Sequence, residues 1–197
     1  MALFSKPELE RVAKFRYSYS VKSESDILLL EDVLFKAKSG DNFDIFLSHR
    51  YLDSEYVLGL KTELENFKCS VFIDWIEEPA YNRSQVSRET AEWLRYMIKK
   101  CRCLLYAISI NSPESKWMPW ELGYGDGIHG RVAIVPISDQ VTISEYYKGQ
   151  EYLGLYPYVT KALSRANNDQ LWVNETENKY VNFSAWLKGE NPTEHMV

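Results

Sequence analysis

The stretch FDIFL, Phe43–Leu47, is followed directly by the polar residues Ser48-His49-Arg50. An apolar segment this short, bounded by polar residues, predicts a buried β-strand. The spacing of the apolar residues then changes to that of a helix, which is expected to begin at about Ser54. The inward-facing positions of that helix are Val57, Leu60, Leu64 and Phe67. A second apolar segment, Val71–Ile73, predicts the next strand and completes a strand–helix–strand unit.

The same alternation continues along the chain. A further helix is expected where apolar residues recur at helical spacing, at Ala91, Leu94, Ile98 and Cys101. Two more strands, Cys103–Ile108 and Val132–Ile137, follow. Strands separated by helices predict a parallel sheet with right-handed crossovers. We therefore expect an α/β fold with an open parallel sheet of about five strands and helices on both faces.

The residues on either side of this pattern are expected to have different roles. Residues 1–40 form an N-terminal helical extension that packs on the main domain or on another subunit. Residues 41–197 form the α/β domain, with the main motifs in 41–138 and a C-terminal elaboration in 139–197. Two segments of the elaboration are expected to complete the sheet edge: Leu171–Val173 and Tyr180–Phe183.

The composition is that of an ordinary globular chain, since 45% of the 197 residues are hydrophobic and 26% are charged. A net charge of −5 offers no general attraction for nucleic acid. No stretch approaches the ~20 apolar residues that a membrane span requires. Met1–Phe15 lacks the apolar segment of a signal peptide. We therefore expect a cytoplasmic protein that binds neither nucleic acid nor a membrane.

The three cysteines, Cys69, Cys101 and Cys103, are odd in number and do not suggest a disulfide framework. The pair Cys101 and Cys103 supplies only two metal ligands, and a metal site needs further partners. We expect three buried thiols and no metal site.

The stretch Trp117–Glu121 carries the strongest functional signal. Pro119 suits the first turn of a helix, where its missing N–H has no partner in any case. Residues one helical turn apart share a face, so the indole of Trp117 is expected to flank the carboxylate of Glu121. A stacking surface beside a carboxylate suits the cleavage of a sugar–base bond. The alternative is that Trp117 and Trp120 are core aromatics and that Glu121 only favours a helix N-terminus.

Ligands of an open parallel sheet bind beyond the carboxyl ends of its strands. Three such ends carry polar or aromatic groups: Ser48-His49-Arg50, Asp74-Trp75 and Ser109-Ile110-Asn111. The loop after the third of them leads into Trp117 and Glu121. This convergence favours a binding site over a purely structural role.

The glycine-rich run Gly123–Gly127 is not a dinucleotide-binding fingerprint, because it follows the start of a helix instead of linking a strand to one. We expect it to permit close packing and to end the helix early.

Three segments, in this order, resemble motifs of Toll/interleukin-1 receptor (TIR) domains. Phe43–His49 is similar to the first box, Ser70–Asp74 to the second box, and Ser115–Glu121 to the motif of the catalytic glutamate in bacterial TIR enzymes. The resemblance spans residues 41–138. It implies a flavodoxin-like sheet and cleavage of NAD at the nicotinamide–ribose bond, with NAD as substrate and no cofactor. In some members it also implies a cyclised product that acts as a signal in anti-phage defence of the Thoeris type.

The resemblance gives Glu121 the catalytic role. Nicotinamide leaves as a neutral group, so the site needs a carboxylate that orients the ribose and stabilises an oxocarbenium-like centre. Trp117 is expected to stack on a flat ring of the substrate, with a role in the core as the alternative. Ser48 bonds a ribose or phosphate, or caps its own turn. His49 lies at the rim beside the substrate, where this chemistry requires no base.

The other candidate substrate-binding residues lie in loops. Arg50 and Arg83 are candidates for neutralising a pyrophosphate, although exposed arginines are common in loops. Asp74 resembles a family position, although an aspartate after a strand commonly caps a turn. Trp75 follows it in the loop of the second box and is a candidate aromatic contact.

We therefore expect an NAD glycohydrolase or ADP-ribosyl cyclase that self-associates through TIR surfaces, with a separate effector protein sensing the product. One alternative is a TIR signalling adaptor without enzymatic activity. The other is an enzyme like nucleoside deoxyribosyltransferase, which uses a related sheet and a glutamate on a different N-glycoside. The presence of Trp117 and Glu121 argues against a pure adaptor.

Overall fold

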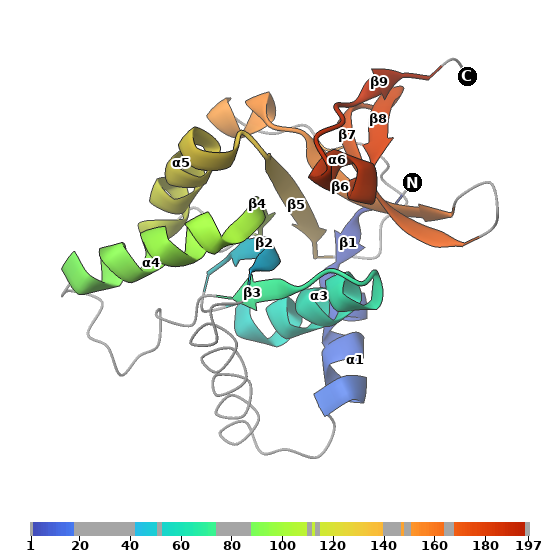
Figure 1. The fold of residues 1–197 in the computed structure, drawn as a ribbon. Helices are drawn as coiled ribbons and strands as arrows, with labels where there is room; N and C mark the ends of the chain where they lie inside the picture. The colour runs from blue at the N-terminus through green and yellow to red at the C-terminus, as the bar shows by residue number, and fades with distance from the viewer. Residues whose placement is uncertain are drawn as a thin grey trace.

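The structure, a computed structural model, describes residues 2–17, 42–50, 53–73, 88–109, 112, 115–139, 147, 151–163 and 168–195. These residues form a mixed β-sheet with helices on both of its faces (Figure 1). None of the helices in this part of the chain is long and apolar enough to cross a membrane.

The parallel part of the sheet consists of β2 (Phe43–Ser48), β3 (Val71–Ile73), β4 (Cys101–Ile108), β5 (Val132–Ser138) and β6 (Tyr158–Leu163). Their spatial order is β3-β2-β4-β5-β6. Numbered along the parallel strands, this is the order 2-1-3-4-5 of flavodoxin-like folds. The expected α/β class and the expected strands are therefore confirmed, and β6, for which no segment was predicted, supplies the fifth parallel strand. The placement of Cys101 on the preceding helix was wrong, because α4 ends at Lys100 and Cys101 already begins β4.

The sheet continues beyond β6 as antiparallel strands: β7 (Asp169–Thr176), β8 (Lys179–Asn182) and β9 (Thr193–Glu194). The N-terminal strand β1 (Phe4–Ser5) lies off this path and pairs in parallel with Ile137 and Ser138 at the end of β5. Among the described residues the sheet thus has nine strands, more than the expected number. The predicted edge segments at 171–173 and 180–183 are confirmed as β7 and β8, except that Phe183 already begins a helix.

Helices cover both faces of the sheet (Figure 1). One face carries α1 (Lys6–Tyr17), α3 (Ser54–Asn66) and α6 (Phe183–Leu187), and the other carries α4 (Arg88–Lys100) and α5 (Trp117–His129). Successive strand residues point to opposite faces. Accordingly Leu47 and Leu105 pack with the first group of helices, whereas Phe46 and Leu104 pack with the second.

The N-terminal residues belong to the same core. Phe4 of β1 and Leu9 of α1 are buried in the cluster that also contains Val57 and Leu60 of α3. Packing of the N-terminal segment on the main domain is thus observed for residues 2–17. The remainder of the expected extension, up to residue 40, lies outside the described residues, and the domain boundary there stays a prediction.

The glycine-rich run does not end its helix, contrary to our expectation. Helix α5 continues through Gly123–Gly127 to His129 and ends at Gly130, whose φ of 56° is left-handed. The close packing is confirmed, because a Cβ on Gly125 would lie 2.8 Å from Cδ1 of Leu104. Packing of α5 on β4 therefore outweighs the low helix propensity of glycine.

The cysteines are free thiols. Cys101 and Cys103 are buried as expected, but Cys69 is only partly buried, so the prediction was wrong for that residue. Cys69 lies just after α3, where the chain turns toward β3 at the edge of the core. Burial still raises the pKa of its thiol to about 11.

Candidate active site

A serine and a glutamate from distant parts of the chain meet on the face of the sheet that α5 covers. The Ser48 hydroxyl donates a hydrogen bond to Oε2 of Glu121 over 2.6 Å. Both side chains are buried, with exposed fractions of 1% for Ser48 and 3% for Glu121. A buried carboxylate needs hydrogen-bond donors. The pair therefore forms the polar centre of the candidate site.

The strand places Ser48. It is the last residue of β2, and it lies on the same face as Phe46, two residues earlier. Phe46 is fully buried in the cluster formed with α4 and α5. The apolar alternation of β2 therefore directs the Ser48 hydroxyl toward α5 at the carboxyl end of the strand, where ligands of such sheets bind.

The helix places Glu121. The hydroxyl oxygen of Ser115 accepts a hydrogen bond from the backbone N–H of Met118 over 3.3 Å, close to the start of α5. Met118 and Leu122 are buried in the core and fix the orientation of the helix. Glu121 lies on this buried face, between the two anchoring residues, so its carboxylate is held against the end of β2.

Trp117 is partly buried and packs on the edge of the core. Its ring lies edge-on to Trp120, with centroids 5.4 Å apart, and Trp120 stacks on Tyr124 at 5.7 Å. The guanidinium group of Arg95 lies over Trp120 at 5.4 Å. Trp117 therefore has structural contacts as well as some free surface, and its stacking on a substrate stays a prediction.

His49 and Arg50 follow Ser48 and are buried, with exposed fractions of 5% and 7%. Nδ1 of His49 lies 3.2 Å from the carbonyl oxygen of Leu47. The alternative of an exposed loop arginine is therefore wrong for Arg50. The substrate-binding roles of both residues stay predictions. Three further candidates, Asp74, Trp75 and Arg83, lie outside the described residues.

A further group, which the sequence analysis missed, is Tyr106. It is the Cα partner of Ser48 in the neighbouring strand β4 and lies in the same cluster as α5. Burial raises its pKa well above the ordinary value, and nearby Tyr152, Glu121 and Tyr147 add to the rise. A tyrosine within an apolar strand is a weak signal, because only the register of the sheet shows that it adjoins Ser48.

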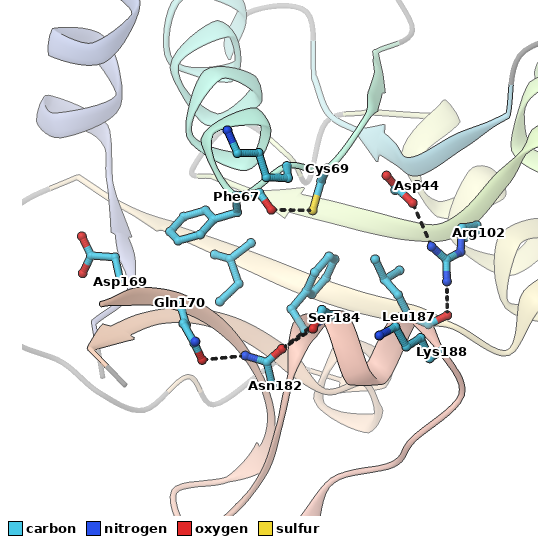
Figure 2. A pocket seen from close by; sticks show the side chains of 13 residues that line it. Asp44, Phe67, Cys69, Arg102, Asp169, Gln170, Asn182, Ser184, Leu187 and Lys188 are labelled. Atoms are coloured by element: carbon cyan, nitrogen blue, oxygen red, sulfur yellow. Dashed lines mark hydrogen bonds and ion pairs between the residues drawn. The ribbon is translucent and has the colours of Figure 1, made fainter. Parts of the chain in front are cut away.

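A cavity of about 410 Å³ lies near the amino ends of β2 and β4, opposite to the carboxyl ends where Ser48 lies (Figure 2). It is lined by Asp44 and Arg102, the second residues of β2 and β4, and by residues of the C-terminal segment such as Leu187. Arg102 donates to Asp44 over 3.0 Å and to the carbonyl oxygen of Leu187 over 2.9 Å. This cavity is therefore a seam at the amino ends of the strands and is separate from the Ser48–Glu121 pair.

The arrangement around Glu121 can hold a sugar. A carboxylate fixed by a serine can accept hydrogen bonds from ribose hydroxyls and can stabilise positive charge at the adjacent carbon. The described residues contain no group of three or more His, Cys, Asp or Glu side chains placed to hold a metal ion.

No protein-family model matches the chain. A probable 3′ cyclic ADP-D-ribose synthase, ThsB′ of Bacillus cereus (strain MSX-D12), is 48% identical over 147 residues, which cover 74% of this chain and 76% of that protein. The chain belongs to the Thoeris TIR family. A second TIR relative, a candidate cyclic ADP-D-ribose synthase named TIR2 from Cytobacillus dafuensis, is 26% identical over 99 residues. That match covers 50% of this TIR chain and 26% of the relative.

The hydrogen bond between Ser48 and Glu121 is expected to support turnover of NAD by this TIR chain. A hydrogen bond to a charged group contributes about 1.5–3 kcal/mol, so Ser48→Ala is expected to lower kcat/KM by about 10–100-fold. Steady-state kinetics measure the effect. The matched control is Ser5→Ala, because Ser5 donates a similar 2.7 Å bond to Glu8 away from Glu121. Wild-type kinetics in Ser48→Ala would show that the bond has no part in the reaction.

Proposed function

We propose that this protein cleaves NAD at the nicotinamide–ribose bond and closes the remaining ADP-ribose into a cyclic product. The observation that carries the proposal is the buried Glu121 carboxylate, held by Ser48 at the carboxyl end of β2. The same chain is 48% identical over 147 residues to a protein named as a probable 3′ cyclic ADP-D-ribose synthase. A buried carboxylate at a ligand-binding edge is the group that N-glycoside cleavage requires.

The chemistry follows from the leaving group. The bond between the ribose carbon and the ring nitrogen breaks, and its electron pair leaves with nicotinamide, which becomes neutral. The ribose carbon then carries developing positive charge, which the Glu121 carboxylate stabilises. A group of the same nucleotide bonds to that carbon, and one proton is released. In this proposal NAD is the substrate, and the reaction needs no resident cofactor.

The product is proposed to be 3′-linked, following the name of ThsB′. Cyclisation requires the nucleotide to fold back on itself in a site that excludes competing water. Such a product is a diffusible signal, which we propose is sensed by a separate effector protein in anti-phage defence. Self-association through TIR surfaces is part of the same proposal.

The expected product distinguishes the proposal from its alternatives. The purified protein is incubated in parallel with NAD and with deoxynucleosides, and the products are separated by chromatography and weighed by mass spectrometry. We expect consumption of NAD, with a main product one water lighter than ADP-ribose. ADP-ribose as the sole product of an active preparation would reject cyclisation. Exchange of bases between deoxynucleosides would indicate a deoxyribosyltransferase-like enzyme instead.

A further inference from the structure

One row of residues crosses the sheet from the candidate site toward the C-terminal segment. Ser48 of β2 is the Cα partner of Tyr106 in β4, Tyr106 is the partner of Ile134 in β5, and Ile134 is the partner of Tyr158 in β6. Partners in register lie on the same face of a sheet. Tyr106 is therefore one strand spacing, about 4.8 Å, from the residue that holds Glu121.

The Tyr106 hydroxyl is an unusual group for a core. The side chain is 3% exposed, yet its hydroxyl makes no hydrogen bond within the part of the chain that the structure describes. Buried tyrosines generally have a hydrogen-bond partner. Among the described residues, Oδ1 of Asn174 is the fully buried side-chain polar atom that has no hydrogen-bond partner. The Tyr106 hydroxyl does not belong to this fully buried class. Within the described part of the chain the Tyr106 hydroxyl therefore has no hydrogen-bond partner, yet it is not fully sealed from solvent.

The surroundings of this hydroxyl are those of the candidate site. Glu121 of α5 and two tyrosines of the C-terminal segment, Tyr147 and Tyr152, are near enough to act on its charge. Tyr147 packs near Tyr158, with ring centroids 6.0 Å apart, and Tyr152 of the 3-10 helix η3 (Glu151–Leu155) is 44% exposed. A tyrosine hydroxyl is protonated at neutral pH, and the upward shift of the Tyr106 pKa only strengthens this, so the hydroxyl is available there as a donor.

We propose that Tyr106 contacts the substrate and that its hydroxyl donates a hydrogen bond to an acceptor oxygen in the ribose–phosphate part of NAD. This inference rests on the proposed function of the Ser48–Glu121 site. With the reacting ribose at Glu121, the acceptors one strand spacing away are oxygens of the sugar and its 5′ phosphate. A protonated phenol fits such oxygens, whereas it offers nothing to the positively charged pyridinium ring.

The energetics support a functional role. A nearly buried hydroxyl without a hydrogen-bond partner among the described residues lowers stability, because most of its contact with water is lost without replacement. Phenylalanine would fill the same volume without that disadvantage. Because tyrosine at position 106 gives a less stable fold than phenylalanine would, its hydroxyl is expected to contribute to binding.

The test is Tyr106→Phe, studied by steady-state kinetics with NAD and by thermal unfolding. We expect KM to rise about tenfold, with kcat changed by less than about twofold, because the lost bond is made in the bound substrate as well as in the transition state. The melting temperature is expected to equal or exceed that of the wild type. A residue with only a structural role would not give this combination.

The matched control is Tyr156→Phe. The Tyr156 hydroxyl donates to Asp126 over 3.0 Å at an exposed position, so its removal is expected to leave KM unchanged and to lower or preserve the melting temperature. If the wild-type protein consumes NAD and Tyr106→Phe has the same KM, the inference about Tyr106 is overturned and the proposed function stands. A wild-type protein that does not consume NAD would overturn the proposed function and this inference together.

Discussion

Replacement of Glu121 by glutamine is expected to lower the turnover of NAD by about 10²–10³-fold, the usual effect of removing one electrostatic contribution to a transition state. Glutamine keeps the shape of the side chain and still accepts a hydrogen bond from Ser48, but it removes the negative charge. Glu121 is 3% exposed, and the attraction between opposite charges is stronger in such surroundings than in water. The measurement is NAD consumption by purified protein whose fold is verified by circular dichroism.

The matched control for this variant is Glu8→Gln, because Glu8 also accepts a hydrogen bond from a serine, Ser5, at 2.7 Å. It is expected to keep wild-type turnover. Glu121→Asp retains the charge but withdraws it by one methylene group, so an intermediate rate is expected. Turnover by folded Glu121→Gln at the wild-type rate would remove Glu121 from the reaction.

Gly59→Ala is expected to have the largest effect on stability. A Cβ at Gly59 of α3 would lie 1.9 Å from the carbonyl oxygen of Leu9 and 2.5 Å from its carbonyl carbon. These are backbone atoms of α1, which cannot turn aside as a side chain can. Alanine is favoured over glycine in a helix by only about 1 kcal/mol, so the clash dominates. We expect the free energy of unfolding to fall by about 3 kcal/mol, measured by urea denaturation.

Gly123→Ala is the control for helix propensity. This glycine lies inside α5, and a Cβ there would meet no atom within 4 Å. The substitution is expected to raise stability by about 0.5–1 kcal/mol. If Gly59→Ala were as stable as Gly123→Ala, α1 would not pack on α3 as closely as the structure shows, and the N-terminal segment would not be part of the core.

The local elements of this protein follow from its sequence. The expected strand Phe43–Leu47 is observed as Phe43–Ser48, and the helix expected from about Ser54 begins there. These elements are short-range patterns, because burial of one face imposes a period of two on strands and 3.6 on helices. Glu121 stood out for a similar reason, since its position relative to Trp117 and Pro119 is visible in the chain itself.

The tertiary structure alone decided which of these groups meet. Ser48 and Glu121 are 73 residues apart in the chain, and no periodicity connects them. The proposed role of Tyr106 depends on the register between β2 and β4, and a register is set by the whole sheet. The contact of Gly59 with Leu9 likewise depends on how α1 docks. The sequence by itself determined strands β2 to β5, the helices between them and the catalytic candidate, because those follow from neighbours along the chain. The partners of Glu121 and the place of the N-terminal segment depend on distant contacts, which form only when all the layers pack together.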